Sequence, residues 1–589
     1  MGIHGDMTAS APSTRTRSTN VLVIGAGGAG LRAAIAARER DVDVLVLGRR
    51  PRRDAHTALA AGGINAALAT VDAEDSWEQH AVDTLVEGQH LGDPAAVELL
   101  CREAGRGIEE LVDWGADFSR TDDGRLDQRY FGAHTYRRTC YVGDRTGRAV
   151  LDALHDRVDG LDIPVLDQHC VTHLLVDAAS CFGAFGFDVV SGERVVLLAD
   201  AVVLAAGGHT RSWARSSSRR DENTGDGLAL ALRSGCSIAN AEMVQFHPTG
   251  MVHPDGWEGT LVTEAVRGRG GRLVNAAGER FMERYDPDRM ELSARDRVAL
   301  ANYTEIQEGR AGPNGGVFLD VTHLGRDAIV DQLPGMRRQF IEAQMLDIAE
   351  EPMEVAPTAH YSMGGVVVEE ETHATEVDNL YAAGECTAGV HGANRLGGNS
   401  LAEVIVFGRR AGEAAADRAR RTVHREPSAI AAAEDDLARW SRPSDDLPLP
   451  VLHELRTLMW DGCGVVRDAD GLQRALDRLD GLAPAVDGVD GAPTAEGWVS
   501  LARSVALRSS LLSARATVVS ALERVESRGA HQRSDHPDPV ADQRSDVVVR
   551  VAADDSLERE RRPVAETPPH LAHLLDESSD TGGAHRLLE

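Results

Sequence analysis

The sequence predicts an α/β protein in which a parallel sheet is interrupted by an α+β insertion and followed by a helical domain and a small C-terminal region. Three observations predict this fold class. A strand, a glycine turn, a helix and a second strand follow one another between residues 21 and 47. Further strands end in glycine as far as residue 385, and helical periodicity replaces this pattern after residue 426. The recurrence of such strands indicates one interrupted domain.

The first of these units is a Rossmann-like βαβ unit. Residues 21–24 (VLVI) read as an apolar strand, residues 25–30 (GAGGAG) as a glycine turn, and residues 31–40 as an Ala-rich helix before a second strand at 42–47. The GxGxxG spacing lets a pyrophosphate reach bare backbone at a helix N-terminus, which favours a dinucleotide site over an ordinary glycine turn. Plain NAD binding is disfavoured, because Gly48-Arg49-Arg50 follows the second strand where many such sites have an acidic residue.

Two later strands extend the same domain. Residues 202–208 (VVLAAGG) and 379–385 (NLYAAGE) are apolar strands that end in glycine turns. The interval between them is long enough for a separate unit. We therefore predict a cofactor domain formed by residues 1–242 plus 356–424, with an inserted domain at 243–355.

The rest of the chain has a different pattern. Ala/Leu/Arg periodicity with charged faces predicts a helical domain at 425–533. The C-terminal region, 534–589, contains a strand-like segment at 547–551 and then a polar, acidic end that we expect to be partly disordered.

Composition excludes several functions. Of the 589 residues, 93 are acidic and 62 basic, which gives a formal charge of −31, and every basic residue is Arg. A chain without Lys has no Walker-type, Schiff-base or general-base Lys. The negative charge argues against nucleic acid as a partner. The acidity fits a halophilic-type surface in a salt-rich cytosol, and base composition is an alternative reason for the missing Lys.

Cysteine spacing and hydropathy exclude further classes of protein. The seven Cys include no CxxC pair and no spacing for a zinc site, an iron–sulfur cluster or a c-type haem, so we predict no bound metal and a reducing compartment. No run of eighteen or more apolar residues occurs, and the short Gly-rich run after residue 20 is a poor signal sequence. We therefore predict no transmembrane segment in this chain.

Ordered motifs then connect the chain with a known family. They are GAGGAG at 25–30, HTALAAGGI at 56–64, QFHPTG at 245–250, Thr263-Glu264, LSARD at 292–296, HYSMGG at 360–365 and HGANRLGGNSL at 391–401. Over residues 20–535 the chain resembles the flavoprotein subunits of succinate dehydrogenases and fumarate reductases, oxidoreductases of electron transport and the tricarboxylic acid cycle. L-aspartate oxidases share this architecture.

The resemblance implies FAD as the cofactor, bound covalently through His56. Such a bond would raise the flavin potential and make succinate oxidation feasible. Family members usually have Gln or Glu where Ala61 stands, which leaves the preferred direction of the reaction open. The positions that match FAD contacts are Gly25, Gly27, Gly28, Gly30, His56, Gly62, Gly63, Asp226, Glu385, Ser400 and Leu401.

The resemblance also implies the substrate site. His247, Thr263, His360 and Arg395 match residues that hold a dicarboxylate, and Arg295 matches the proton shuttle. A free guanidinium titrates near ~12.5–13.8, so Arg295 is intrinsically a proton donor, which favours fumarate reduction. The insertion resembles a capping domain that closes over the substrate. Taken singly, these residues would read as ion-pair, turn and loop residues.

Electrons must leave the flavin, and the chain has no second redox centre of its own. The resemblance implies an iron–sulfur subunit, together with membrane-anchor subunits, that passes electrons to a quinone, with this chain cytoplasmic and peripheral on the cytoplasmic face of the membrane. Two alternatives stay open: an L-aspartate oxidase that forms iminoaspartate, and a flavin-fold binding module without turnover. His56 and residues 396–398 (LGG) argue against the first. The four substrate-end residues His247, Arg295, His360 and Arg395 argue against the second.

Overall fold

A computed structural model describes residues 14–177, 180–420 and 425–580. Its centre is a seven-stranded sheet of order β6-β2-β1-β9-β8-β7, with β16 paired to β9. Strands β6, β2, β1, β9 and β16 run parallel, as the predicted βαβ unit requires, whereas β8 and β7 are antiparallel. Their bounds are β1 Thr14–Ile24, β2 Val44–Leu47, β6 Val165–Leu166, β7 His169–Asp177, β8 Ser180–Asp188, β9 Arg194–Leu204 and β16 Leu380–Ala382.

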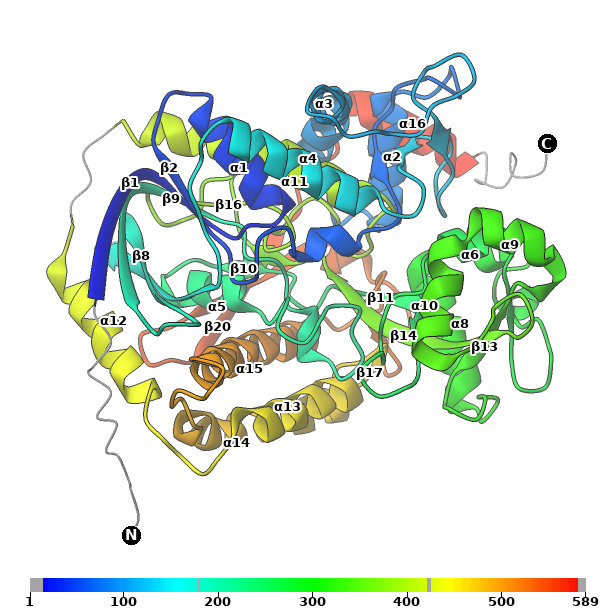
Figure 1. The fold of residues 1–589 in the computed structure, drawn as a ribbon. Helices are drawn as coiled ribbons and strands as arrows, with labels where there is room; N and C mark the ends of the chain where they lie inside the picture. Colours follow the sequence, from blue (N-terminus) through cyan, green and yellow to red (C-terminus); the bar gives the residue numbers. More distant parts are fainter. Residues whose placement is uncertain (1–13, 178–179, 421–424, 581–589) are drawn as a thin grey trace, which may run out of the picture.

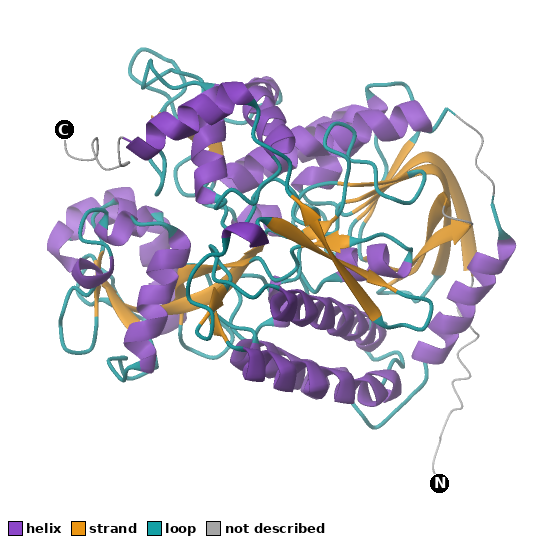
Figure 2. Ribbon diagram, turned by 180° about the vertical axis from the view of Figure 1, so that it is seen from behind, coloured by secondary structure: helices purple, strands orange, loops and turns teal. Residues whose placement is uncertain are grey.

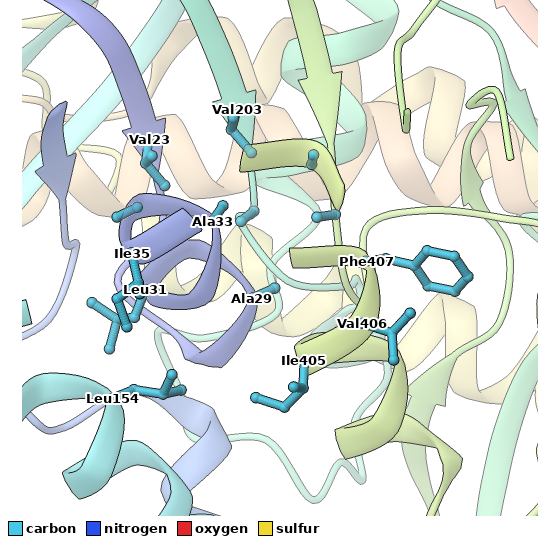
Figure 3. Close-up of a cluster of buried hydrophobic side chains, with 14 of the residues drawn as sticks. Val23, Ala29, Leu31, Ala33, Ile35, Leu154, Val203, Ile405, Val406 and Phe407 are labelled. Carbon is cyan, nitrogen blue, oxygen red and sulfur yellow. The ribbon is translucent and has the colours of Figure 1, made fainter. Parts of the chain in front are cut away.

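Helices α1 (Gly28–Arg38), α4 (Thr146–Gly160) and α11 (Asn399–Arg418) form a layer on one side of this sheet (Figure 1). Figure 3 shows Val23 and Val203 of the sheet above Ala33 and Leu31 of α1, with Ile405 of α11 beside them; all five are fully or almost fully buried. Small residues allow α1 and α11 to approach closely: a Cβ at Gly412 would lie 2.1 Å from the Ala33 carbonyl oxygen. The glycine turn is therefore held by a rigid core.

The inserted segment, residues 244–362, has its own sheet and lies to one side of the molecule (Figure 1, green). Four antiparallel strands have the order β11-β14-β13-β12, and α8 packs against β11 and β14. The segment comprises β11 Val244–Met251, α6 Ala265–Gly268, β12 Arg272–Val274, α7 Met282–Tyr285, α8 Arg295–Gln307, β13 Val317–Asp320, α9 Arg326–Gln332, α10 Pro334–Gln344 and β14 Met353–Ser362. The predicted domain boundaries stay predictions, while the predicted fold class is confirmed.

Helices of the C-terminal third pack beneath the central sheet (Figure 2), except that the first of them packs against β7 at the edge of the sheet. They are α12 Pro427–Trp440, α13 Pro448–Gly462, α14 Ala469–Gly488 and α15 Val499–Glu523. Among the residues that the structure describes, α15 alone is long and apolar enough to cross a membrane, and 83% of its most apolar window is buried in the protein. It is a core helix of this fold.

The C-terminal region contains a hairpin and a helix. The predicted strand at 547–551 lies in β19 (Ser545–Val551), and β20 (Leu557–Pro563) and α16 (Pro569–Asp580) follow it. The expectation of partial disorder stays a prediction. Arg559 and Arg561 on β20 pair with Glu523 of α15, and these ion pairs hold the hairpin against the helical layer. The predicted disorder at 581–589 lies outside the described residues.

Short elements complete the framework. Strands β10, β15, β19 and β20 form one sheet, and β3, β4 and β5 another. Their bounds, with those of the remaining helices and strands, are α2 Trp77–Glu87, α3 Pro94–Asp113, α5 Asp226–Arg233, β3 Ile64–Asn65, β4 Gln128–Arg129, β5 Thr139–Cys140, β10 Ile238–Ala239, β15 Gly365–Val366, β17 Val466–Arg467, β18 Gln532–Arg533 and the 3-10 helices His56–Leu59, Thr210–Ser212, Met290–Leu292, Thr322–Leu324 and Ala541–Gln543.

Candidate active site

One cavity of about 580 Å³ extends from the glycine turn after β1 to the seam with the inserted segment. Every predicted site residue except Gly30 lines this cavity. Sequence positions as distant as Gly25 and Leu401 therefore meet in a single space, of a size that suits a cofactor together with a small substrate.

Gly25, Gly27 and Gly28 line the cavity at the N-terminus of α1. Gly25 has φ +121°, a conformation that favours glycine, and Gly27 is the N-cap of α1. The bare backbone and the N-terminal end of α1 suit an anionic pyrophosphate. Gly30 is predicted to face that phosphate but lies against the turn instead, where a Cβ would come within 1.8 Å of the Gly25 carbonyl oxygen. Its absent side chain permits close helix–strand packing.

Asp226 lies at the start of α5 and forms an ion pair with Arg49. Thr224 Oγ1 donates to Asp226 Oδ2 at 3.0 Å, while Oδ1 is buried without a protein partner. An acceptor of this kind fits a ribose hydroxyl of a dinucleotide. The arginine that takes the place of the usual acidic residue after β2 is thus neutralised by a carboxylate from another element.

His56 opens the short 3-10 helix His56–Leu59 and lines the cavity. Its Nδ1 lies 3.2 Å from Glu222 Oε2, and Glu222 also accepts from Arg219 at 2.8 Å. Burial alone lowers the pKa of His56, but the hydrogen bond and the charge of Glu222 outweigh it, so the net pKa is raised. The Glu222 contact engages Nδ1 and does not involve Nε2, the other ring nitrogen.

The N-terminus of α11 forms the far wall, with Ser400 and Leu401 in its first turn. The wall is fixed by the buried Asn399. Its Oδ1 accepts from Asn65 Nδ2 at 2.7 Å and lies 2.8 Å from His80 Nε2, and its Nδ2 donates to Thr84 Oγ1 at 2.9 Å.

His80 makes this wall sensitive to acid. Burial and the charge of Arg138 lower its pKa to about 3. Because the unfolded histidine titrates near ~6.5, the folded protein loses stability as the pH falls below that value, by about 1.4 kcal/mol per pH unit. We expect the holoprotein with His80→Gln, which keeps a donor toward Asn399, to show a shallower loss of unfolding free energy in urea between pH 6.5 and 5. An unchanged slope would show that His80 is protonated in the folded state.

The substrate end brings together Arg295 of α8, His247 of β11, His360 of β14, Thr263 before α6 and Arg395 before α11. The two histidine rings meet edge to face with centroids 5.2 Å apart. Each of the five predicted residues comes from a different segment. The packing of the inserted segment on the central domain therefore creates this end of the cavity.

The surroundings of both histidines at this end favour the uncharged ring. The pKa of His247 is well below its usual value because of burial and the Arg295 charge, and that of His360 is lowered by burial and His247. His247 Nδ1 lies 3.2 Å from both the Thr249 backbone nitrogen and its hydroxyl, and 3.3 Å from the Thr249 carbonyl oxygen. Ser217 Oγ lies 2.9 Å from His360 Nδ1. Each ring is therefore oriented through Nδ1.

Positive charge at this end is carried by fixed guanidinium groups. Burial and the nearby Arg295 lower the pKa of Arg395 to about 10, which still leaves Arg395 charged at neutral pH. Its guanidinium lies 4.3 Å from the centre of the Tyr361 ring, and its Nε is buried without a protein partner. A carboxylate would complete this site.

Glu264 and Gln245 lie within the motifs quoted above but are not among the predicted site residues. Glu264 Oε2 accepts from Arg295 Nε at 2.7 Å. Burial would raise the pKa of Glu264, but the charges of Arg295 and Arg267 lower it to about 2, so it remains a carboxylate. Gln245 Oε1 accepts from both Arg295 and Arg395. Only their position within the ordered motifs could have indicated these two residues from the sequence. No short sequence spacing connects either of them with Arg295.

The residues that the structure describes contain no candidate metal site. They contain no group of three or more His, Cys, Asp or Glu side chains arranged to hold an ion. All seven cysteines are buried free thiols.

Two family models match this chain. The FAD binding domain matches residues 20–401, and the fumarate reductase flavoprotein C-terminal domain matches residues 452–570. The first match covers most of the chain and includes every predicted site residue.

Similar proteins cover nearly the whole chain. A fumarate reductase (CoM/CoB) subunit from Methanothermobacter marburgensis is 44% identical over 88% of this chain and 94% of its own length. The succinate dehydrogenase flavoprotein subunit of Rickettsia bellii is 35% identical over 88% and 90%. Among solved structures, Sdh1 of Mycobacterium smegmatis in complex with UQ1 aligns with TM-score 0.88 and 39% identity over 98% of this chain and 99% of that one. Escherichia coli quinol fumarate reductase aligns with TM-score 0.89 and 33% identity over 94% and 98%.

Proposed function

Since this chain belongs to the succinate dehydrogenase and fumarate reductase flavoprotein family and is an FAD-dependent oxidoreductase, we propose that it interconverts succinate and fumarate at the seam between the inserted segment and the central domain. One observation carries the proposal. Two guanidinium groups, two neutral histidines and a threonine converge at one end of the FAD cavity.

This set suits a four-carbon dicarboxylate. Arg395 supplies a fixed positive charge, while the His247 ring and the Thr263 hydroxyl supply uncharged hydrogen-bonding groups. A charged group and uncharged hydrogen-bonding groups together can bind two carboxylates and hold the substrate in one orientation. Because the groups are buried, water is excluded from the contacts and each is strengthened.

Arg295 moves the proton in this proposal. It is 8% exposed and lines the cavity, with its Nε held by Glu264 and its Nη1 by Gln245. As a protonated group it donates to fumarate. For succinate oxidation it must accept a proton, and Glu264 with the neighbouring Arg267, 3.6 Å from Glu264 Oε2, provides a route for that proton to leave.

FAD fits the residues present. The Gly25–Gly28 backbone would hold its pyrophosphate, Asp226 a ribose hydroxyl, and the N-terminus of α11 the pyrimidine end. When bound, FAD supplies the hydride acceptor or donor at flavin N5. We propose that His56 Nε2 carries the flavin covalently, because Glu222 occupies Nδ1 and the ring lines the cavity.

Electron transfer beyond the flavin needs a partner. Relatives named succinate dehydrogenase or 8-methylmenaquinol:fumarate reductase flavoprotein subunits are parts of larger enzymes. We propose an iron–sulfur subunit, together with membrane-anchor subunits, for this chain, with the chain peripheral on the cytoplasmic face. Co-purification of an iron–sulfur protein with the tagged chain from its host membranes would support this, and recovery of the tagged chain alone would oppose it.

L-aspartate oxidase is not favoured, since the relatives named above are fumarate reductases and succinate dehydrogenases. Dye reduction by the holoprotein tests the choice. Succinate is expected to drive reduction of an artificial acceptor, and L-aspartate is expected to give only background. Reduction by L-aspartate alone would replace the proposal with the oxidase, and reduction by neither would favour the binding module.

A further inference from the structure

Gln245 links the two arginines of the substrate end. Its Oε1 accepts from Arg295 Nη1 at 3.1 Å and from Arg395 Nη2 at 3.0 Å. The glutamine is fully buried, so water does not compete for these bonds. Two guanidinium groups this close repel each other, and a shared neutral acceptor fixes their separation without neutralising either charge.

Asn394 fixes the orientation of the Gln245 amide from behind. Gln245 Nε2 donates to Asn394 Oδ1 at 2.8 Å and to the Arg395 carbonyl oxygen at 3.0 Å. Asn394 Nδ2 donates to Glu87 Oε1 at 2.7 Å and to Asp296 Oδ1 at 2.9 Å. With both amide protons of Asn394 directed at carboxyl oxygens, its Oδ1 remains for Gln245, and Gln245 Oε1 must face the arginines.

This chain of amides joins separate parts of the fold. Arg295 and Asp296 lie on α8 of the inserted segment, and Gln245 lies on β11, the first strand of that segment. Asn394 and Arg395 precede α11 of the central domain. The bonds that Gln245 makes to Asn394 and Arg395 are therefore contacts that exist only while the inserted segment is packed against the central domain.

We propose that Gln245, anchored by Asn394, is the positioning residue that sets the spacing of Arg295 and Arg395 for turnover. The inference rests on the proposed function, in which Arg295 moves the proton and Arg395 binds a carboxylate. Gln245 touches neither substrate carbon in this role and acts through the two guanidinium groups.

Replacing Gln245 by Met removes the shared acceptor while keeping the volume. We expect kcat for succinate oxidation to fall about 100-fold, as misplacement of reacting groups by an ångström does, while KM changes much less. Covalent flavin and malonate binding are expected to persist. Gln128→Met is the matched control: Gln128 is also buried and bonds to Ala66 and Thr70, away from the cavity, so the control should keep wild-type kcat.

Asn394→Leu tests the anchor, because the Asn394 side chain contacts neither guanidinium group. We expect a similar fall in kcat, and a double variant no slower than Gln245→Met, since both changes release the same amide. Multiplied effects in the double variant would show that the two residues act independently and would overturn the anchoring role.

A crystal structure of the Gln245→Met holoprotein gives a readout that does not depend on turnover. The two guanidinium groups are expected to move apart. Unchanged positions, a kcat within threefold of wild type, or joint loss of flavin and malonate binding would each overturn the positioning role. A wild-type protein inactive with succinate and fumarate would instead overturn the proposed function, and the crystallographic separation would still decide whether Gln245 sets the spacing.

Discussion

Replacing Arg295 by Gln is expected to abolish turnover of succinate and fumarate while FAD remains bound. The change removes the guanidinium group that lines the substrate end and is held by the Glu264 carboxylate. Among the predicted substrate-end residues that the structure describes, no other has both properties. General acid–base groups contribute about 10²–10⁴-fold, so a loss of roughly a thousandfold in kcat is expected. Glutamine keeps a hydrogen-bonding amide, and Glu264 stays satisfied through Gly132 at 3.0 Å.

Arg297→Gln is the matched control for that variant. Arg297 lies two residues further along α8, is exposed, and pairs with Asp286 instead of a cavity residue. Stopped-flow reduction by succinate and the flavin absorbance of both purified variants measure the effect. A variant at Arg295 that loses its flavin as well as its turnover, or retains turnover within tenfold, would contradict the shuttle role.

The fold followed from patterns that repeat locally. The GxGxxG turn, its flanking strands and the later glycine-ended strands depend on backbone sterics and apolar alternation, which a sequence displays directly. The partial disorder expected after residue 551 stays a prediction, although β20 lies in that stretch, where its arginines are held by a glutamate of α15, thirty-six and thirty-eight residues away in sequence. A charged segment reads as solvated until its distant partners are known.

The site was predicted residue by residue from motifs, but not the bonds between its members. Nothing in the segment Gly48-Arg49-Arg50 indicates that Arg49 will pair with Asp226, and nothing in the QFHPTG motif places Gln245 between two arginines. Gly30 shows that membership of a motif does not by itself place a residue against the ligand, since this glycine allows close packing against the Gly25 carbonyl oxygen. Long-range side-chain pairs are set by the tertiary fold.

The negative charge of the chain makes the two arginines of the substrate end more important for binding a dianion. A protein of formal charge −31 does not attract a dianion by its overall field, which salt screens within about 10 Å in any case. Arg295 and Arg395 line the cavity together with His247 and His360, and the Glu264 carboxylate compensates the charge of Arg295. Substrate binding in this protein is therefore expected to depend weakly on surface charge and strongly on this buried set.

Replacing His56 by Ser is expected to remove the covalent bond to FAD and to impair succinate oxidation more than fumarate reduction. Serine cannot supply the Nε2 nucleophile, but the cavity, the glycine turn and the N-terminus of α11 remain to bind FAD noncovalently. A covalent bond to the protein raises the flavin potential, so its loss weakens the flavin as an oxidant of succinate. Each tenfold loss of rate corresponds to about 1.4 kcal/mol of activation free energy.

His169→Ser isolates the effect, because His169 lines the same cavity near Cys170 and bonds through Nδ1 to the Asp167 carbonyl oxygen. After denaturation in acid, yellow fluorescence should migrate with the wild-type and His169→Ser chains on a gel, whereas His56→Ser should release free flavin into the supernatant. Fluorescence that stays with the His56→Ser chain would place the attachment elsewhere. Free flavin from the wild type would show that the cavity holds FAD by contacts alone and would contradict the covalent bond through His56.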